Sequence, residues 1–397
     1  MNNEQSKIGL MTFHAAHNYG SVLQAFATQQ IIKKLGYESE IINYRLKNQR
    51  MYYNRLYTTK FGLKHFLHQI IRFSEHRKRC IRAQKFEKFI AEKLKKTDQE
   101  FTTFSELKSS VSDYPVLISG SDQVWNLHCT AEFKTEPPES ILGYYLVFGS
   151  DDAKRIAFSS SFGSMRPQEV GAFRDYLARY DALSVREASG VKILKELLDK
   201  EVENTLDPTL MLNSEEWSKL TFWERPSDKY IFVYTLSRYK SVQHLLKLIS
   251  EFARKSGLKV ICSAPFSLVH VSGIQACPDC GPQDFLTYIK NAELVITDSF
   301  HGTAFSINME TPFYVIQSGR DRRKLQLLEK LGLESRILYS VEELRNVRDY
   351  ACDFNDSQER LALERKKTLL YLENALKQAV CERGVTQHGN YKHMQGD

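Results

Sequence analysis

The sequence predicts an α/β fold made of two similar halves that face each other across a cleft. Short apolar runs alternate with turn-rich loops and amphipathic segments, which is the pattern of parallel strands joined by helices. The alternation stops at about 213–229, where Asn, Ser, Pro and Asp cluster, and then starts again. A length of 397 residues also favours two domains. Ligands of such sheets bind beyond the carboxyl ends of the strands, so we searched the loops that follow strands.

The first half, predicted to span 1–215, opens with a complete strand–helix–strand unit. Residues 8–13 form an apolar run, and 21–35 carry apolar residues at helical spacing up to Gly36, a glycine of the kind that ends helices. Residues 40–43 resume a strand, which implies parallel pairing with a right-handed crossover. The same half contains further predicted strands at 116–119, 155–159, 182–185 and 201–204, and helices at 167–179 and 186–198.

The second half, predicted to span 216–356, repeats this alternation. Its expected strands are 230–235, 258–262, 294–297 and 313–316, and its expected helices are 242–255, 283–291, 302–308 and 322–331. A long helix over 357–383 follows, and we expect it to pack back on the first half. Residues 384–397 are polar and are predicted to form a tail.

Composition and charge exclude several classes of protein. Hydrophobic residues make up 42% and charged residues 26%, which excludes intrinsic disorder, a collagen-like chain and a disulfide scaffold. The net charge of +7 comes from 72–96 alone, which holds ten basic and three acidic residues. We therefore expect no nucleic-acid partner, but a positive stripe on a helical insertion at about 60–96. The stripe suits peripheral contact with an anionic membrane, and a solvated helix face is the alternative.

Cysteine usage and the apolar segments bear on location. Seven cysteines, an odd number in a long chain, fit a reducing compartment. The first residues lack a basic region followed by a long apolar core, and the apolar stretch at 141–148 is too short to cross a bilayer. We expect a cytoplasmic protein, peripheral at the inner membrane surface.

The first polar loop joins the strand at 8–13 to the helix at 21–35. It contains His14 and ends in the run His17, Asn18, Tyr19, Gly20 and Ser21. Free N–H groups and the dipole at a helix N-terminus favour an anion at such a place. An Asn/Gly turn with Ser21 as an ordinary cap is the alternative.

The second loop, 119–126, follows a buried strand and sets an acid beside an amide and an indole. Asp122 could act as a general base or orient a sugar hydroxyl, in the company of Gln123 and Trp125. Gly-Ser-Asp is also a common turn sequence. Two further positions are individually unremarkable: Arg186 ends a strand, and Asp207 precedes a proline turn.

The third loop, 297–303, brings Asp298, Ser299 and His301 to the start of a helix opened by Gly302 and Thr303. Hydroxyl, imidazole and helix N–H groups there would bind a phosphate, and a histidine can transfer a proton near neutral pH. A helix cap with a structural histidine is the alternative.

A fourth loop, 318–323, carries Arg320 and Arg322, whose forked donors suit carboxylate or phosphate, although solvated salt pairs are commoner. Cys277 and Cys280 have the spacing of a metal knuckle, but no second pair accompanies them, so we expect free thiols and no metal site. The sequence has no P-loop, no HExxH and no clear GxGxxG, and thus gives no support to nucleotide hydrolysis or zinc proteolysis.

Taken together, these loops resemble the polysaccharide pyruvyl transferase family. Five motifs occur in order, and the similarity runs from about 8 to about 335; the motifs are 18–26, 120–126, 184–187, 207–210 and 297–303. The resemblance implies two Rossmann-like halves in a GT-B-like arrangement. It implies a bacterial transferase that moves the enolpyruvyl group of phosphoenolpyruvate onto two hydroxyls of a hexose in a capsule or exopolysaccharide precursor, releasing phosphate. It further implies a lipid-linked acceptor and no cofactor besides the donor substrate.

The resemblance also implies roles for single residues. His301 would be the general acid, and Asp122 and Asp207 would position or deprotonate acceptor hydroxyls. Arg186 would hold the donor, and the second half would be the donor side; the residues expected to assist are Ser299, Gly302 and Thr303. The first half would be the acceptor side; the residues expected to line the cleft are His17, Asn18, Tyr19, Gly20, Ser21, Gln123, Trp125 and Asp298.

This chain departs from the family pattern at one donor position. Some members have Arg where this chain has Ser299, so Arg320 or Arg322 would have to supply the missing cation. Two other functions stay open, a GT-B-like glycosyltransferase that uses a nucleotide sugar and a non-catalytic glycan-binding module. Stabilisation by phosphoenolpyruvate but not by UDP or CMP would distinguish the pyruvyl transferase from the glycosyltransferase.

Overall fold

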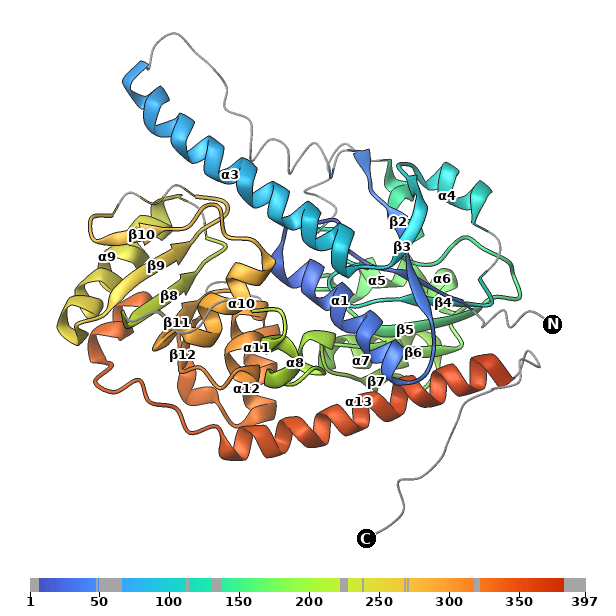
Figure 1. The fold of residues 1–397 in the computed structure, drawn as a ribbon. Coiled ribbons are helices and arrows are strands. Elements are labelled where there is room, and N and C mark those ends of the chain that lie inside the picture. Colours follow the sequence, from blue (N-terminus) through green and yellow to red (C-terminus); the bar gives the residue numbers. More distant parts are fainter. Residues whose placement is uncertain are drawn as a thin grey trace.

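The computed structural model describes residues 7–47, 49, 66–111, 114–129, 137–221, 228–237, 239–267, 269, 271–317 and 322–381 of the chain. Figure 1 shows two sheets, each surrounded by helices, with the chain passing from the first sheet to the second near its middle. Every strand pair described is parallel. The predicted α/β fold with two Rossmann-like halves is confirmed.

The first sheet has seven strands in the order β3-β2-β1-β4-β5-β6-β7. The strands are β1 (Ile8–Met11), β2 (Ser39–Tyr44), β3 (Lys96–Phe101), β4 (Val116–Ser119), β5 (Lys154–Ser160), β6 (Ala182–Val185) and β7 (Glu203–Asn204). The accompanying helices are α1 (Tyr19–Lys34), α3 (Phe66–Lys93), α4 (Phe104–Ser110), α5 (Pro167–Gly171), α6 (Arg174–Leu177), α7 (Ala188–Leu198) and α8 (Ser214–Ser218), with 3-10 turns η2 (Pro138–Gly143) and η3 (Pro208–Leu210). Ile8 in β1 lies opposite both Ser39 and Val116, so the strand order reverses between β1 and β4.

The second sheet has six strands in the order β10-β9-β8-β11-β12-β13. The strands are β8 (Tyr230–Tyr234), β9 (Lys259–Ser263), β10 (Ile274–Ala276), β11 (Leu294–Thr297), β12 (Phe313–Ile316) and β13 (Ile337–Leu338). The helices are α9 (Tyr239–Ser256), α10 (Pro282–Asn291), α11 (Phe300–Asn308), α12 (Arg323–Leu331) and α13 (Asn355–Cys381), with 3-10 turns η4 (Glu334–Arg336) and η5 (Val341–Asn346). Both sheets thus have the strand order of a dinucleotide-binding fold, with the reversal between β8 and β11 here.

Three strands were absent from the sequence prediction, namely β3, β10 and β13. All three lie at the edge of a sheet, where a strand has one neighbour only. β3 has the sequence KTDQEF and only its last residue, Phe101, is buried. Because most of its side chains face solvent, it lacks the apolar run that marks the central strands. The sequence analysis had instead included Lys96 in the helical segment 60–96.

The two halves share a hydrophobic core. One cluster of buried side chains contains Ile8 and Ile118 of the first sheet together with Phe232 and Val295 of the second. Tyr19 of α1 is part of the same cluster and stacks on Phe285 of α10, with ring centroids 4.4 Å apart. Apolar packing between the halves therefore fixes how their polar loops face each other.

The long helix α13 runs beneath both halves and is drawn in red in Figure 1. Its Thr368 Oγ1 accepts a hydrogen bond from the backbone N–H of Leu206 at 3.0 Å, and its Tyr371 hydroxyl donates to the carbonyl of Ala157 at 2.7 Å. Arg365 of the same helix donates to Asn308 in the second half at 2.5 Å. The predicted tail at 384–397 lies outside the described residues.

Candidate active site at the junction of the two sheets

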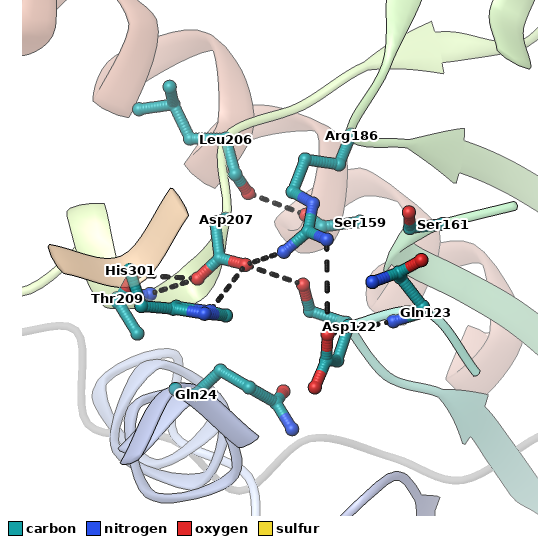
Figure 2. Close-up of polar contacts among 12 residues, drawn as sticks. Gln24, Asp122, Gln123, Ser159, Ser161, Arg186, Leu206, Asp207, Thr209 and His301 are labelled. Carbon is teal, nitrogen blue, oxygen red and sulfur yellow. Dashed lines mark hydrogen bonds and ion pairs between the residues drawn. The ribbon is translucent and has the colours of Figure 1, made fainter. Parts of the chain in front are cut away.

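Polar loops from both halves meet beyond the carboxyl edges of the two sheets (Figure 2). The loop after β4 carries Asp122, the loop after β6 carries Arg186, and the chain after β7 carries Asp207. The second half contributes His301, the second residue of α11, which follows β11. Because β4 and β11 each lie where the strand order reverses, these groups occupy the crevice in which parallel sheets bind ligands.

Asp207 is a fully buried carboxylate whose two oxygens are both in use. Its Oδ1 accepts hydrogen bonds from the backbone N–H and the hydroxyl of Thr209, at 2.9 and 2.7 Å. Its Oδ2 accepts from the Ser121 hydroxyl at 3.0 Å and from Nη1 of Arg186. The same oxygen lies 3.6 Å from Nε2 of His301. Asp207 therefore holds the cation and the imidazole in place and has no oxygen left to serve an acceptor hydroxyl.

The charge of Asp207 is set by competing effects. Burial by itself would raise its pKa, but His301, Arg186 and the hydroxyl of Thr209 outweigh burial and hold the pKa well below its usual range. The carboxyl is therefore ionised near neutral pH. When His301 carries a proton on both ring nitrogens, Asp207 supplies the counter-charge.

Arg186 is a buried cation with unused donors. Its side chain is 3% exposed, and its guanidinium lies 4.5 Å from the ring centroid of Phe300. Nη2 lies 3.9 Å from Oδ1 of Asp122, which is too long for a hydrogen bond. Among the described residues, neither Nε nor Nη2 has a hydrogen-bond partner. Because buried donors are normally paired, the unused N–H groups of this guanidinium are available to bind an anion.

Asp122 occupies a strained position next to Arg186. Its φ of 73° lies in the left-handed region, which non-glycine residues seldom adopt and which is found mostly at functional sites. Its Oδ2 accepts a hydrogen bond from the Ser21 hydroxyl at 2.6 Å, and its Oδ1 accepts from the backbone N–H of Gln123 at 2.9 Å. Unlike Asp207, Asp122 is partly exposed, at 12% of its side chain, so it can reach a substrate hydroxyl.

The imidazole of His301 lies against the backbone of Gly20. A Cβ atom added to Gly20 would lie 1.9 Å from Nδ1 and 2.2 Å from Cγ of that ring. Only glycine permits this approach, because the Nδ1 edge of the ring lies against its backbone while Nε2 is buried and faces Asp207. The start of α1 and the start of α11 thus form one unit across the two halves.

A pocket of about 230 Å³ begins at the Arg186–Asp207 pair and runs between the halves. The first half contributes the residues after β6 and β7, and the second half contributes Phe300 and one face of α12. The lining residues are Arg186, Ala188, Asn204, Thr205, Leu206, Asp207, Leu210, Phe300, Arg323, Gln326, Leu327, Glu329 and Lys330. The pocket is large enough for a small organic anion and presents it to a buried guanidinium.

Comparison with models of known protein families identifies the family of this chain. A model of the family described as polysaccharide pyruvyl transferase matches residues 18–320, which is most of the chain. The chain belongs to the polysaccharide pyruvyl transferase family. The resemblance seen in the five sequence motifs is confirmed, and transferase activity on a polysaccharide is the function that this membership supports.

Comparisons with individual proteins are less specific than the family match. No curated protein matches the chain in sequence. Among solved structures, the UDP-N-acetylglucosamine 2-epimerase from Rickettsia bellii is 10% identical with a TM-score of 0.49, covering 94% of this chain and 97% of that one. The UDP-GlcNAc 2-epimerase from Methanocaldococcus jannaschii is 13% identical with a TM-score of 0.45, covering 90% and 98%. The glycosyltransferase SnogD from Streptomyces nogalater is 10% identical with a TM-score of 0.40, covering 95% and 99%.

In this pyruvyl transferase family member, Asp298 does not line the cleft as predicted. Its carboxylate instead fixes the loop after β8. It accepts hydrogen bonds from the hydroxyls of Thr235 and Ser237, at 2.7 and 2.6 Å, and from the backbone N–H of Leu236 at 2.8 Å. An acid with that many internal donors builds the loop and leaves no oxygen directed at a substrate.

The other predicted donor residues of this loop also have internal roles. Ser299 is the N-cap of α11, where its hydroxyl accepts a hydrogen bond from the N–H of Gly302. A Cβ at Gly302 would lie 2.4 Å from the Thr297 hydroxyl, so glycine is needed there for close packing. The Thr303 hydroxyl donates to the carbonyl of Ser299 at 2.9 Å. Of the motif 297–303, His301 and Phe300 direct side chains at the site, where His301 faces Asp207 and Phe300 packs on the guanidinium of Arg186.

Two aromatic residues predicted to line the acceptor side are core residues. Trp125 is fully buried, stacks on Tyr145 at 5.6 Å and donates from its indole N–H to the carbonyl of Tyr144 at 3.1 Å. Tyr19 is fully buried between the halves, and its hydroxyl donates to the carbonyl of Cys280 at 2.8 Å. Their large apolar rings bury more surface in the core, and so stabilise the fold more, than they would beside a sugar.

The remaining residues of the first loop divide between fold and site. His17 pairs with Glu87 of α3 at 2.8 Å, away from the reaction centre. Asn18 caps α1, where its side chain accepts a hydrogen bond from the N–H of Gly20. Ser21 contacts Asp122 and Gly20 contacts His301, so these two lie beside the candidate site, and their role on the acceptor side stays a prediction.

The arginines of the fourth loop are distributed differently from the prediction. Arg320 lies outside the described residues. Arg322 is the residue before α12 and its side chain is exposed. Its neighbour Arg323, which the sequence analysis did not single out, lines the pocket. Because α12 begins at Arg323, a shift of one position along the chain separates an exposed side chain from one that lines the pocket. No local sequence pattern indicates which of the two adjacent arginines enters the pocket.

The basic stripe on α3 is divided between the interior and the surface, since three of its positive residues bind inside the molecule whereas others, such as Lys88 and Lys93, are exposed. Arg82 is 4% exposed, donates to the carbonyl of His17 at 2.9 Å and lies 5.1 Å from the ring centroid of Tyr19. Arg79 donates to the carbonyl of Pro265 at 3.1 Å, and Lys85 pairs with Asp284 at 2.8 Å, both in the second half. The helix therefore ties the two halves together at the site, and of its positive residues only some face solvent.

Among the residues that the structure describes, no three His, Cys, Asp or Glu side chains gather as ligands for a metal ion. All seven cysteines are free, and Cys277 and Cys280 are buried thiols. No helix in the described ranges combines the length and the apolar character that crossing a bilayer requires.

Proposed function

We propose that the protein transfers the enolpyruvyl group of phosphoenolpyruvate onto two hydroxyls of a hexose in a bacterial surface-polysaccharide precursor. Family membership supports polysaccharide pyruvylation, and the choice of donor and acceptor is our inference from the site. One observation carries it. A buried guanidinium with unused N–H groups lies next to a histidine that is paired with an ionised carboxylate. An enol phosphate ester needs both an anion receptor and a proton donor.

The reaction starts with the donor held by Arg186. His301 gives a proton to the methylene carbon C3, which becomes a methyl group, while positive charge develops at C2 next to the ester oxygen. The first sugar hydroxyl adds to C2 and the bond from C2 to the phosphate oxygen breaks. The second hydroxyl then adds to C2 and closes the ketal. Of the two hydroxyl protons, one restores His301 and the other leaves with phosphate, so atoms and charge balance.

Asp122 is the carboxylate suited to the acceptor hydroxyls. It is partly exposed, and the hydroxyl of Ser21 lies 2.6 Å from its Oδ2. It can accept the proton of an attacking hydroxyl and pass it on, which raises the nucleophilicity of the sugar oxygen. Asp207 keeps His301 and Arg186 in register and remains ionised throughout. Asp122 and Asp207, which were predicted to share one role, therefore have different roles in this proposal.

The decisive experiment follows the fate of C3. The protein is incubated in D₂O with phosphoenolpyruvate and hexosides that have free O4 and O6 hydroxyls, and products are examined by NMR and mass spectrometry. We expect a ketal whose methyl group carries one deuterium, with phosphate released in equal amount. His301→Ala should lose at least about a hundredfold in rate, whereas His244→Ala, at an exposed histidine paired with Glu342, should retain full rate. Full transfer by His301→Ala would refute the acid assignment.

Binding of the donor distinguishes the other two functions. A pyruvyl transferase should be stabilised against thermal unfolding by phosphoenolpyruvate and not by UDP or CMP. Stabilisation by the nucleotides alone would instead indicate a nucleotide-sugar glycosyltransferase. Binding of saccharide with no transfer from any donor would indicate a glycan-binding module.

We further propose that the acceptor is lipid-linked and that the protein acts in the cytoplasm, peripheral to the inner membrane surface. The free cysteines support a reducing compartment. Since Arg79 and Arg82 are used internally, the exposed neighbours Arg77 and Lys78 are candidates for contact with anionic lipid. Replacing both by Gln should reduce sedimentation with phosphatidylglycerol vesicles, by about 1 kcal/mol per residue. Unchanged sedimentation would remove the membrane proposal and leave a solvated helix face.

A further inference from the structure

Arg323 lines the same pocket as Arg186 but belongs to the other half of the molecule. It is the first residue of α12, in the second half, whereas Arg186 follows β6 in the first half. The guanidinium of Arg323 also reaches the loop after β4. Its two terminal nitrogens lie 3.0 and 3.1 Å from the side-chain amide of Gln123, the residue next to Asp122. The two arginines therefore enclose the same space from different halves of the molecule.

We propose that Arg323 is the second cation of the donor site, and that phosphoenolpyruvate is gripped between Arg186 and Arg323. The inference rests on the proposed function for the identity of the ligand, but the residues are chosen by the pocket alone. A donor with a carboxylate and a phosphate presents two separate anionic groups. Two forked guanidiniums in one pocket, each from a different half, match that arrangement better than one.

The local charges support a second cation. Arg186 donates to Asp207, so its positive charge is largely balanced before any ligand arrives. Lys330, at the far end of the pocket, is balanced by Glu364 at 2.9 Å and also donates to Asn204 at 2.7 Å. Apart from Arg323, the lining residues include two positive side chains, Arg186 and Lys330, and two acids, Asp207 and Glu329. Without it, a trianionic donor would meet a site with little net positive charge.

The proposal also accounts for the position that departs from the family pattern. Ser299 is buried as the cap of α11 and cannot supply a cation. Of the two arginines expected to replace it, Arg322 is exposed, and Arg320 lies outside the described residues. Arg323 supplies the charge from a different helix. Because the ligand then touches both halves, its binding should stabilise their closed arrangement.

The test measures phosphoenolpyruvate binding by calorimetry in the His301→Ala background, which prevents turnover. Arg323→Gln should weaken binding by about tenfold to a hundredfold, the range expected for charge-assisted hydrogen bonds. Arg322→Gln is the matched control, because it removes the same charge from the adjacent exposed position, and its binding should stay within about twofold. Circular dichroism and melting temperature confirm that each variant is folded.

The outcomes separate this inference from the proposed function. Equal affinity of Arg323→Gln and the His301→Ala parent would overturn the role of Arg323 while leaving the function intact. Absence of binding by both the parent and the wild-type protein would refute the donor assignment itself. Should Arg323→Gln not fold, Arg323→Lys replaces it, since it keeps the charge but loses the fork. At least threefold weaker binding then supports a bidentate contact, and unchanged binding overturns it.

Discussion

Replacing Gly20 by alanine tests the contact on which the site depends. The added Cβ would lie 1.9 Å from Nδ1 of His301, and ordinary contact between such atoms begins at 3.4 Å, so the imidazole has to move by about 1.5 Å. The ring cannot move freely, because it is 8% exposed and faces the buried Asp207. A displacement of about 1 Å in a reacting group costs on the order of a hundredfold in rate. We therefore expect kcat to fall by about a hundredfold or more.

The same substitution should lower the free energy of unfolding by only about 1–3 kcal/mol, the range for overpacking a buried site, so the protein should stay folded and the loss of rate can be separated from unfolding. Gly20 lies in the first turn of α1 without a left-handed φ, so alanine is compatible with its backbone and gains up to about 1 kcal/mol of helix propensity. Gly171→Ala is the control, because it lies at the end of α5 with nothing within 4 Å of a new Cβ. It should leave kcat unchanged.

The assay is phosphate release from phosphoenolpyruvate with a hexoside acceptor, measured together with the melting temperature. A double variant completes the argument. Once His301 is replaced by alanine, the Cβ at position 20 meets no ring, so adding Gly20→Ala should cause no further loss. A kcat for Gly20→Ala within threefold of wild type would refute the reasoning, as would a further large loss in the double variant.

Three other predictions concern buried charged or titratable groups. Asp207→Asn should lower the free energy of unfolding by about 3–5 kcal/mol at pH 7, because it leaves the guanidinium of Arg186 unpaired. Since the pKa of Asp207 is lower in the fold than its usual 3.8, this stabilisation is complete above about pH 5 and is lost on acidification. The difference from wild type in urea unfolding should therefore shrink below pH 4, and a constant difference would contradict the prediction. Burial lowers the pKa of His14 from 6.5 to about 4, with Arg45 adding to the effect and the hydrogen bond to Asn43 opposing it. As the pH falls, the unfolded chain takes up this proton first, so the free energy of unfolding should fall by up to about 1.4 kcal/mol per pH unit between pH 6.5 and 4. His14→Gln should show a flatter dependence of urea unfolding on pH over that range, and an identical dependence would count against the prediction. Arg82→Gln should lower both the melting temperature and kcat, because it removes a buried hydrogen bond to the loop that leads into α1 and Gly20. Lys88→Gln, on the exposed side of α3, should change neither.

The regular elements could be predicted because their signal is local. The central strands β1, β4, β8 and β11 are buried along their whole length, and each therefore appears as an apolar run followed by a turn. Loops after such strands meet at one edge of a parallel sheet, so the convergence of the polar motifs was also predictable. The edge strands escaped because solvent, rather than a neighbouring layer, covers most of their side chains.

The roles of individual residues were less predictable, because a motif does not state which of its polar groups already have partners. Asp298 and Asp207 both follow strands in polar motifs, yet both carboxylates serve the protein, one in a loop and the other behind the reacting groups. Among the described residues, the carboxylate of Asp122 accepts two hydrogen bonds, fewer than that of either Asp298 or Asp207. Trp125 and Tyr19 illustrate the same limit for aromatic side chains, since only the packing of the halves shows that their rings are enclosed.

By itself, the sequence determined the α/β class, the positions of nearly all central strands and the loops from which the site is made. These properties follow from hydrophobic periodicity and turn chemistry, which act over a few residues. The tertiary structure decided that His301 packs on Gly20, that Arg82 ties α3 to the first loop, and that Arg323 rather than Arg322 lines the pocket with Arg186. Such pairings depend on how two separately folded sheets pack together, and that geometry arises from contacts far apart in the chain.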